Sequence, residues 1–311
     1  MQDFRVCFVG VGSIAKRHIK NLRAICPTRG LNITIDAYRR SSSSYEAEGV
    51  DRVFTDLKDM EAHYDAVFIT NPTEYHLDAL RSFHEVSDHF FIEKPLVSLK
   101  QLDSASGFPF RKDAVYYVAC PLRYNAVIQY IAENIDVHDV ISVRSISSSY
   151  LPDWRPGQDY RDTYSAHKDL GGGVSIDLIH EWDYLSFLFG KPLSVKSLIG
   201  KKSPLEIDSD DYAIYIGEYK DRIVELHLDY FGRKTIRRIE LFTKNDTIVG
   251  DLVSNTISFL VEGKTIDFHE ERDDFQKREL NHFLDVIYCG KENDSSHEHA
   301  VDVLKLTQGD V

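Results

Sequence analysis

Short apolar segments alternate with amphipathic segments along the first 120 residues. Residues 5–9 form a nearly continuous apolar run that ends at a glycine, which is typical of a strand buried on both faces of a parallel sheet. Residues 13–25 carry Ile14, Ile19 and Leu22 at helical spacing, and a second helix is predicted over 75–86. Further strands are predicted over 33–37, 66–70, 90–92 and 114–119. This alternation predicts an α/β domain with a doubly wound parallel sheet.

The pattern changes after Cys120 and Pro121. Helices are predicted over 125–134, 174–189, 275–287 and 297–306, and strands over 140–146, 213–218, 223–228, 237–242, 247–252, 256–260 and 265–268. Turn residues such as Asn245-Asp246 separate the later strands, as in an antiparallel meander. We therefore expect two domains, residues 1–121 and an α+β domain over residues 122–311.

The charge balance restricts the classes of partner. There are 37 basic and 50 acidic side chains, so the formal net charge is 37 − 50 = −13, which disfavours nucleic acid and membrane surfaces as partners. The four cysteines show no CxxC pair, which favours reduced thiols over zinc or disulfides, and we predict no metal site. With no leader sequence and no apolar run of about 20 residues, we expect a cytoplasmic protein.

A glycine motif follows the first predicted strand. It is a GxGxxA pattern made of Gly10, Gly12, Ser13, Ile14 and Ala15 with the intervening valine. The first glycine permits a tight turn, the second lets the backbone approach a pyrophosphate, and the alanine keeps the helix close to the sheet. The helix N-terminus then presents N–H groups to the phosphates. This context, after a buried strand, predicts a dinucleotide site.

The second strand bears on the choice of cofactor. An NAD site usually has an acid at the end of this strand to bind the adenosine ribose diol. Here Asp36 comes too early, Tyr38 takes the usual acid position, and Arg39, Arg40 and Ser41 follow. Two cations and a hydroxyl favour a 2′-phosphate, and therefore NADP(H). The alternative is that both arginines are solvated loop charges, which leaves NAD open.

Three further segments complete a recognisable set. Thr70-Asn71-Pro72 is followed by His76, Glu93-Lys94-Pro95 follows a strand, and a glycine triplet at 171–173 leads to Asp177 and His180. Together with the glycine motif, these segments resemble the Gfo/Idh/MocA oxidoreductase family over essentially the whole chain. The resemblance implies an N-terminal Rossmann domain over residues 1–121. It also implies a substrate-binding second domain whose mostly antiparallel, open-faced sheet forms homo-oligomers, either dimers or tetramers.

The resemblance also implies roles for individual residues. Beside the cofactor it places Thr70, Asn71, Pro72, His76, Glu93 and Lys94, with Glu93 near the nicotinamide ribose and Lys94 toward the reacting carbon. Asp177 and His180 would join Lys94 as catalytic residues. Hydride transfer to a ketone builds negative charge on oxygen, so a donor must stabilise it and deliver a proton. We also expect a cis Lys94–Pro95 bond, because the lysine turns sharply off a strand.

The spacing of the second-domain residues differs from that of many family members. Asp177 and His180 are three apart on one predicted helix, so they would share a face. Many members have four positions there, and the fourth is filled by Glu181, which is a competing candidate for the site. We align His180 with the family histidine because it stands three before Asp183.

Substrate contacts are predicted in two places. Trp154, Arg155, Tyr160 and Arg161 lie in a long polar loop over 147–168, where arginines with aromatics suit a phosphate, carboxylate or nucleotide on the substrate. The alternative is a loop that contacts another subunit. The other place is Arg123-Tyr124, which resembles the family segment that lines the substrate pocket. With Asp177 and Glu181, these residues form the predicted substrate set.

The family resemblance implies an enzyme, an NAD(P)-dependent dehydrogenase or ketoreductase that acts on CH–OH groups of a sugar or nucleotide sugar. The long loop is similar to that of members in bacterial surface-sugar biosynthesis. Two alternatives stay open: a dinucleotide-binding sensor without chemistry, and redox-assisted elimination or glycoside cleavage without net redox change. Retention of Lys94 and His180 argues against the sensor.

Overall fold

The computed structural model describes residues 1–39 and 48–309. They form two compact units, one of residues 1–120 with Arg272–Val301, the other of Pro121–Glu271 with the segment from Asp302 onward. Residues 272–301 follow the predicted boundary in sequence but belong to the first unit, because the helix that they contain completes the core of that unit.

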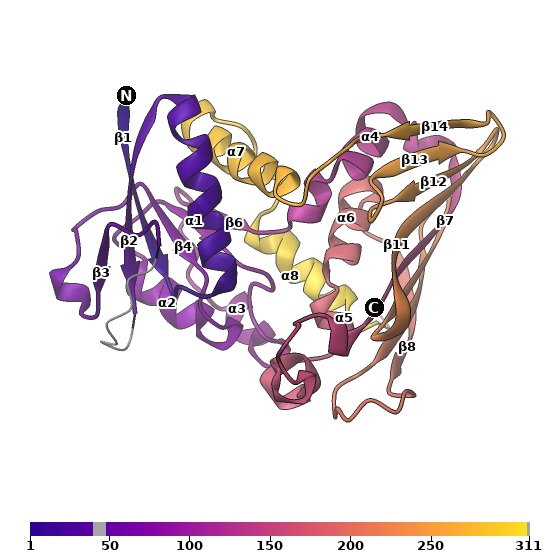
Figure 1. Ribbon diagram of the computed structural model, residues 1–311, viewed down its shortest axis with the longest axis horizontal. Helices are drawn as coiled ribbons and strands as arrows, with labels where there is room; N and C mark the ends of the chain where they lie inside the picture. The colour runs from indigo at the N-terminus through magenta and orange to yellow at the C-terminus, as the bar shows by residue number, and fades with distance from the viewer. Residues whose placement is uncertain (40–47, 310–311) are drawn as a thin grey trace. The chain divides into compact units, whose positions relative to one another are not determined.

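The first unit is built on a six-stranded parallel sheet in the order β3-β2-β1-β4-β5-β6 (Figure 1). This order reverses direction at β1, which confirms the predicted doubly wound Rossmann sheet. Its strands are β1 Gln2–Val9, β2 Leu31–Tyr38, β3 Arg52–Phe54, β4 Ala66–Ile69, β5 His89–Ile92 and β6 Val115–Val118. Its helices are α1 Ser13–Ile25, α2 His76–Phe83, α3 Leu102–Ser106 and α7 Asp274–Cys289.

One apolar cluster holds this unit together. Phe8, Phe68 and Phe91 project from neighbouring strands, and the Phe8 and Phe68 rings stack with centroids 4.6 Å apart. Helix α7 lies beside α1 (Figure 1). The Phe283 ring of α7 packs edge-on against Phe68 and Phe91. Each large aromatic ring buried here removes about 150–250 Å² of surface from water, which stabilises the unit.

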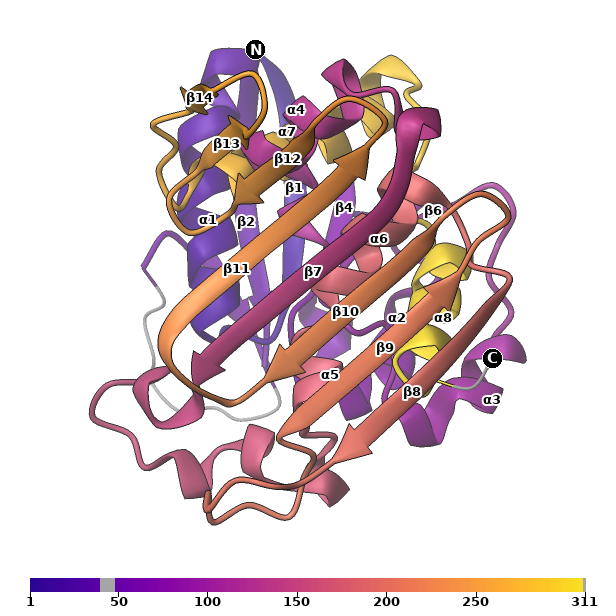
Figure 2. The same cartoon turned by 90° about the vertical axis from the view of Figure 1, so that its right-hand side faces the viewer.

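The second unit is built on an eight-stranded sheet in the order β14-β13-β12-β11-β7-β10-β9-β8 (Figure 2). All neighbouring strands are antiparallel except the parallel pair β7 and β10, which confirms the mostly antiparallel prediction. The strands are β7 Val140–Tyr150, β8 Ser194–Gly200, β9 Tyr212–Glu218, β10 Ile223–Asp229, β11 Phe231–Thr243, β12 Thr247–Asp251, β13 Thr256–Phe259 and β14 Lys264–Asp267. Strands β3 and β8 were not predicted.

Helices α4 Ala126–Asn134, α5 Val174–Asp177 and α6 His180–Phe189 belong to the second unit, and α8 His297–Leu306 is divided between the units at Val301 and Asp302. The single predicted helix over 174–189 is wrong in one respect. Leu178 has ψ of 31°, so the chain leaves helical geometry between Asp177 and His180. The two residues do not lie on one continuous helix, and the prediction that they share a helix face is therefore wrong.

Among the described helices, none is long and apolar enough to cross a lipid bilayer. Cys7, Cys26 and Cys120 are buried and Cys289 is exposed, and no disulfide joins these four residues. The three buried thiols therefore contribute to packing.

Candidate dinucleotide site and candidate catalytic residues

The predicted cofactor residues of the first unit follow the carboxyl ends of three adjacent parallel strands. Gly10 follows β1, Thr70 follows β4 and Glu93 follows β5. The Thr70 Oγ1 hydroxyl donates to the Gly10 carbonyl at 2.8 Å, and the Glu93 N–H donates to the Ile69 carbonyl at 2.9 Å. Ligands of open α/β sheets bind outside the carboxyl ends of the strands where the strand order reverses. These residues lie at that edge.

The glycine turn has the geometry that a dinucleotide requires. Gly10 has φ of +88°, and a Cβ there would lie 2.9 Å from the Asn71 Cα, so only glycine fits. A Cβ on Gly12 would meet nothing within 4 Å, which means that the backbone faces open space. Helix α1 has no side-chain cap at Gly12, so the N–H groups of its first turn are available to an external acceptor. The residues therefore fit a pyrophosphate group.

The other motif residues divide between solvent and core. Ser13 is exposed at the first turn of α1, Ile14 is half-buried, and Ala15 is buried in the cluster that joins α1 to the sheet. Ala15 therefore performs the packing role predicted for it.

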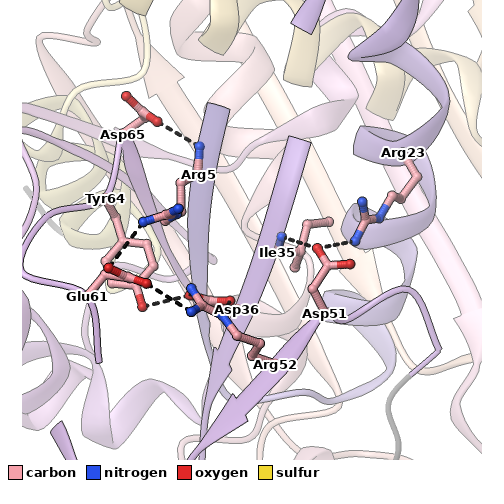
Figure 3. A network of polar contacts seen from close by, with 9 residues as sticks. All are labelled: Arg5, Arg23, Ile35, Asp36, Asp51, Arg52, Glu61, Tyr64 and Asp65. Carbon is pink, nitrogen blue, oxygen red and sulfur yellow. Dashed lines mark hydrogen bonds and ion pairs between the residues drawn. The ribbon is translucent and has the colours of Figure 1, made fainter. Parts of the chain in front are cut away.

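Asp36 does not face the cofactor edge. Its buried carboxylate accepts from Arg52 Nε at 2.9 Å and Nη2 at 2.7 Å, and from the Tyr64 hydroxyl at 3.0 Å (Figure 3). At the end of β2, the Tyr38 ring packs edge-on against Phe83 with centroids 5.6 Å apart. Within the described part of β2, the only acidic side chain is thus committed to the scaffold.

The cationic residues that follow β2 are only partly described. The Arg39 backbone N–H donates to the Phe54 carbonyl at 2.9 Å and the side chain is half-buried. Arg40 and Ser41, which carry much of the NADP(H) prediction, lie outside the described residues.

His76 is buried behind the strand ends. Its Nε2 lies 2.9 Å from the Asn71 carbonyl oxygen and its Nδ1 lies 3.1 Å from the Leu96 carbonyl oxygen. Burial lowers the pKa of His76, while both carbonyls oppose the shift. The histidine thus connects the loop of Asn71 and Pro72 to the loop that follows Lys94. Pro72 itself is exposed.

The Glu93-Lys94-Pro95 segment contains a contact that sequence reasoning missed. The His18 Nε2 of α1 lies 2.6 Å from Glu93 Oε1, and His18 is buried. Lys94 is half-buried, and its bond to Pro95 is cis, as predicted. The signal for His18 was present in the sequence, because it lies in the apolar stripe of α1 between Ala15 and Leu22.

In the second unit, Asp177 is the centre of an aromatic cluster. Its Oδ2 accepts from the Tyr230 hydroxyl at 2.6 Å, and burial together with the Asp177 charge raises the pKa of Tyr164. The Trp154 indole packs edge-on against the Tyr230 ring at 5.2 Å, and the Arg155 guanidinium lies 5.2 Å from the Tyr164 ring centroid. The structure therefore brings the predicted loop residues Trp154 and Arg155 into the surroundings of Asp177.

A second carboxylate near Asp177 was also missed. Asp210 Oδ2 accepts from the Ser175 N–H at 2.9 Å, and Asp210 Oδ1 occupies the space where a Cβ on Gly173 would lie. Burial raises the pKa of Asp210, and the neighbouring Asp177 charge adds to the increase. This contact explains why a glycine, Gly173, stands directly before α5.

Tyr160 and Arg161 take part in contacts within the polar loop. Arg161 pairs with Asp159 at 2.6 Å and with Glu206 at 2.7 Å, and the Tyr160 hydroxyl accepts from the Glu206 N–H at 3.1 Å. A small hollow beside them is lined mainly by Trp154, Arg155, Gln158, Tyr160, Thr163 and Ser165. The lining thus includes all of the predicted loop residues except Arg161.

Two other predicted substrate residues are buried in ion pairs. The Arg123 guanidinium donates to both Asp183 oxygens, at 3.0 and 2.5 Å, and Tyr124 beside it is buried. Glu181 Oε1 accepts from Arg237 Nε at 2.6 Å. Burial raises the pKa of Glu181, while Arg237 opposes the shift. His180 directly precedes Glu181 in the sequence and is the first residue of α6. Its side chain is half-buried.

One group of described residues has ligand atoms close enough to surround a cation. It consists of His167, Asp169 and Asp208. The His167 Nε2 lies 2.7 Å from the Arg161 carbonyl oxygen, and Asp208 Oδ1 accepts from the Lys168 N–H at 2.7 Å. These bonds stabilise the loop by themselves, so the group needs no metal to account for it.

Two family models match the chain. Residues 4–118 match the model of an oxidoreductase family with an NAD-binding Rossmann fold, and residues 128–249 match the GFO/IDH/MocA C-terminal domain. The matched segments thus coincide with the parallel sheet and with most of the eight-stranded sheet.

Three curated proteins are similar in sequence. The chain is 22% identical to myo-inositol 2-dehydrogenase of Thermotoga maritima, over 90% of this chain and 83% of that protein. It is 23% identical to UDP-N-acetylglucosamine 3-dehydrogenase of Acidithiobacillus ferrooxidans, over 85% and 79%. The match to the uncharacterized oxidoreductase YrbE of Bacillus subtilis is 24% identical over 60% of this chain but only 54% of that protein.

Two solved structures share the fold. The UDP-N-acetylglucosamine 3-dehydrogenase of Acidithiobacillus ferrooxidans superposes with a TM-score of 0.78 at 20% identity, covering 99% of this chain and 96% of that one. A levoglucosan dehydrogenase in complex with NADH superposes with a TM-score of 0.84 at 16% identity, covering 99% and 95%. At these identities the likeness establishes the fold.

Proposed function

Since this chain belongs to the GFO/IDH/MocA family of NAD-binding oxidoreductases, we propose that it transfers a hydride between a nicotinamide dinucleotide and a hydroxyl or ketone carbon of a sugar or nucleotide sugar. The observation that carries the proposal is the glycine turn, where Gly10 is required by its φ of +88° and Gly12 faces open space. The relatives named as sugar and nucleotide-sugar dehydrogenases support the substrate class.

The bound dinucleotide supplies or accepts the hydride. The side chains of this chain must therefore bind the substrate and move the accompanying proton. We assign proton transfer to two side chains, the Lys94 amine and the His180 imidazole. Lys94 lies just after β5, at the edge of the sheet where we place the dinucleotide, and His180 is the first residue of α6. Asp177, fixed by the Tyr230 hydroxyl, is assigned to orient the substrate or the histidine.

The Asp177 cluster suits a sugar. Trp154 offers an apolar ring face, Asp177 a carboxylate acceptor for hydroxyls, and Arg155 a cation for an anionic substituent. A sugar that carries a phosphate, carboxylate or nucleotide matches all three. A role in bacterial surface-sugar biosynthesis is the corresponding biological proposal, in the cytoplasm, where nicotinamide cofactors are abundant.

We assign the cofactor as NADP(H) in preference to NAD(H). The support is that Asp36 is committed to Arg52 and Tyr64, so it does not provide a carboxylate for the ribose diol. The half-buried Arg39 would then serve as a cation for the 2′-phosphate.

We also propose that the chain forms a dimer or tetramer through the eight-stranded sheet. In the register of β8, β9 and β10, Leu198 pairs with Ile214, and Ile216 follows on the same face. Leu198, Ile216 and Ile223 are at least half exposed. Contiguous exposed apolar side chains of this kind mark association surfaces. Light scattering should give a mass of at least two chains, and Ile216→Glu should reduce it.

Hydride transfer is tested by following absorbance of the reduced nicotinamide with NAD⁺ and NADP⁺ against myo-inositol, levoglucosan and UDP-N-acetylglucosamine. General acid–base help contributes roughly 10²–10⁴ in rate, so Lys94→Met and His180→Ala should lower turnover by that order while the dinucleotide still binds. Asp177→Asn should cost less if Asp177 only orients its neighbours. Tight dinucleotide binding without turnover of any sugar would contradict the oxidoreductase proposal and favour a sensor.

A further inference from the structure

His18 is a polar residue at a position where the fold supplies apolar ones. It lies in the buried stripe of α1 with Ala15, Ile19 and Leu22, and only 1% of it is exposed. Its ring packs edge-on against Phe91 with centroids 5.1 Å apart. Burying an imidazole among aromatic rings costs free energy unless its nitrogens are hydrogen-bonded. A hydrogen-bonding contact of the ring is therefore needed to offset the cost of burying it.

That contact is with Glu93. The His18 Nε2 lies 2.6 Å from Glu93 Oε1, at a point where the histidine side chain is 1% and the glutamate side chain 14% exposed. An ionised carboxylate only accepts hydrogen bonds, so Nε2 carries the proton and donates. Among the described residues, Nδ1 of His18 has no hydrogen-bond partner. Among the described residues, the imidazole thus makes one hydrogen bond, and its partner is a single oxygen of Glu93.

The position of Glu93 gives the contact a purpose. Among the described residues, His18 is the hydrogen-bond partner of the Glu93 carboxylate, through Oε1. The other oxygen, Oε2, is available as an acceptor, and the side chain is not fully buried. Glu93 follows β5, two strands from the Gly10 turn and on the side opposite β2. The adenosine ribose of a dinucleotide lies at the end of β2, so the β5 side receives the nicotinamide riboside.

We propose that His18 is a positioning residue, which holds the Glu93 carboxylate so that its second oxygen accepts a hydrogen bond from a hydroxyl of the nicotinamide riboside. The inference rests on the proposed function, because it presupposes that a dinucleotide binds. His18 touches neither the cofactor nor the substrate. It acts by restricting the rotamers of Glu93, whose freedom would otherwise be lost on binding at a cost in affinity.

The test compares NADH and NADPH with ADP, which contains the adenosine and pyrophosphate but lacks the riboside. Calorimetry on the purified full chain should show that His18→Leu weakens the binding of both nicotinamide dinucleotides about tenfold, while ADP binds as to the wild type. His18→Gln, which keeps an N–H donor at similar reach, should restore affinity to within about threefold. A merely structural lesion would weaken ADP equally and would not be rescued by glutamine.

A matched control is available in the same unit. His84 follows α2 and its Nδ1 lies 3.0 Å from Glu85 Oε1, so it forms a histidine–glutamate pair in which the glutamate side chain is 85% exposed. His84→Leu should leave the affinity for NADH unchanged. If His18→Leu does not fold, Glu93→Gln provides the same comparison, since it removes the carboxylate and should also weaken NADH and NADPH selectively over ADP.

The possible outcomes distinguish the role of His18 from the proposed function. Unchanged NADH and NADPH affinity in His18→Leu, or an equal loss for ADP and the dinucleotides, overturns the role of His18 and leaves the proposed function intact. A wild-type chain that binds neither NADH nor NADPH overturns both.

Discussion

Glu93 of the first unit and Glu181 of the second are both glutamates that the sequence assigns to a site, but their surroundings differ. Glu93 follows a strand at the ligand edge of the parallel sheet, is partly exposed, and has one oxygen engaged by a histidine. Glu181 is fully buried and forms an ion pair with Arg237 of the antiparallel sheet. The same residue type thus lies partly exposed at the edge of the parallel sheet in one unit and in a buried ion pair in the other.

The same distinction separates the predicted cations. Lys94 is half-buried beside Glu93, whereas Arg123 is 1% exposed and donates two hydrogen bonds to Asp183. Removing a buried charge from water is expensive, and its partner offsets that cost only with good geometry. We therefore expect a buried charged residue with such a partner to stabilise the fold and not to bind the substrate.

The largest effect that we expect concerns Arg123. Arg123→Met removes both hydrogen bonds from the guanidinium to the buried Asp183 carboxylate, and this should lower the free energy of unfolding by about 3–5 kcal/mol. Urea denaturation measures the loss. A variant that keeps full stability but loses substrate binding would contradict this structural role. Arg123 would then be a substrate-binding residue, as the sequence predicted.

Arg144 provides the control for this measurement. It forms an ion pair with Glu225 at 3.5 Å on the exposed side of the same sheet, with side chains 58% and 49% exposed. Arg144→Ala should change the free energy of unfolding by no more than about 1 kcal/mol, because exposed pairs are screened by water.

Glu181 should give a pH signature. Burial raises the folded-state pKa of Glu181 above the ordinary value of 4.5, so the folded chain binds this proton more tightly than the unfolded chain. The contribution of Glu181 to stability is therefore greatest below pH 4.5 and falls as the pH rises through the raised pKa. Glu181→Gln should flatten this part of the profile and leave turnover within about threefold. A loss of turnover as large as that of His180→Ala would show that Glu181 belongs to the site.

The smallest effect that we expect concerns His76. Unlike Glu93 and Lys94, this predicted site residue of the first unit is fully buried. Burial lowers its folded-state pKa below 6.5, so its contribution to stability is present above pH 6.5 and is lost as the pH falls through the lowered value. His76→Gln should therefore lose less unfolding free energy than the wild type on acidification below pH 6.5, as measured by urea denaturation at a series of pH values. An identical acid profile would mean that His76 is not neutral in the folded chain.

The fold was largely predictable because strand and helix periodicity is local. The parallel sheet, the antiparallel sheet and the cis Lys94–Pro95 bond are confirmed. The contacts of α7 were not predictable, because its apolar stripe fits either unit until the core is known. The break at Leu178 was also missed, since no proline or glycine marks it.

The site residues were predictable as types and not as contacts. The glycine turn follows from chain geometry alone, and Gly10 and Gly12 lie as expected. The pairing of Arg123 with Asp183 and of Asp36 with Arg52 joins residues 60 and 16 positions apart, which no local pattern encodes. Asp210 and Tyr230 were missed for the same reason, whereas His18 was missed although its place in the apolar stripe of α1 marked it.

The proposed function depends most on dinucleotide binding at the glycine turn. A calorimetric titration of the wild type and of Gly12→Val with NADH and NADPH tests it directly. A Cβ at Gly12 meets nothing within 4 Å and the backbone φ of −81° suits any residue, so the variant should fold. Valine would occupy the space that the pyrophosphate needs. We predict one dinucleotide per wild-type chain and no measurable binding to the variant. Equal affinity of the two proteins would contradict the proposed site.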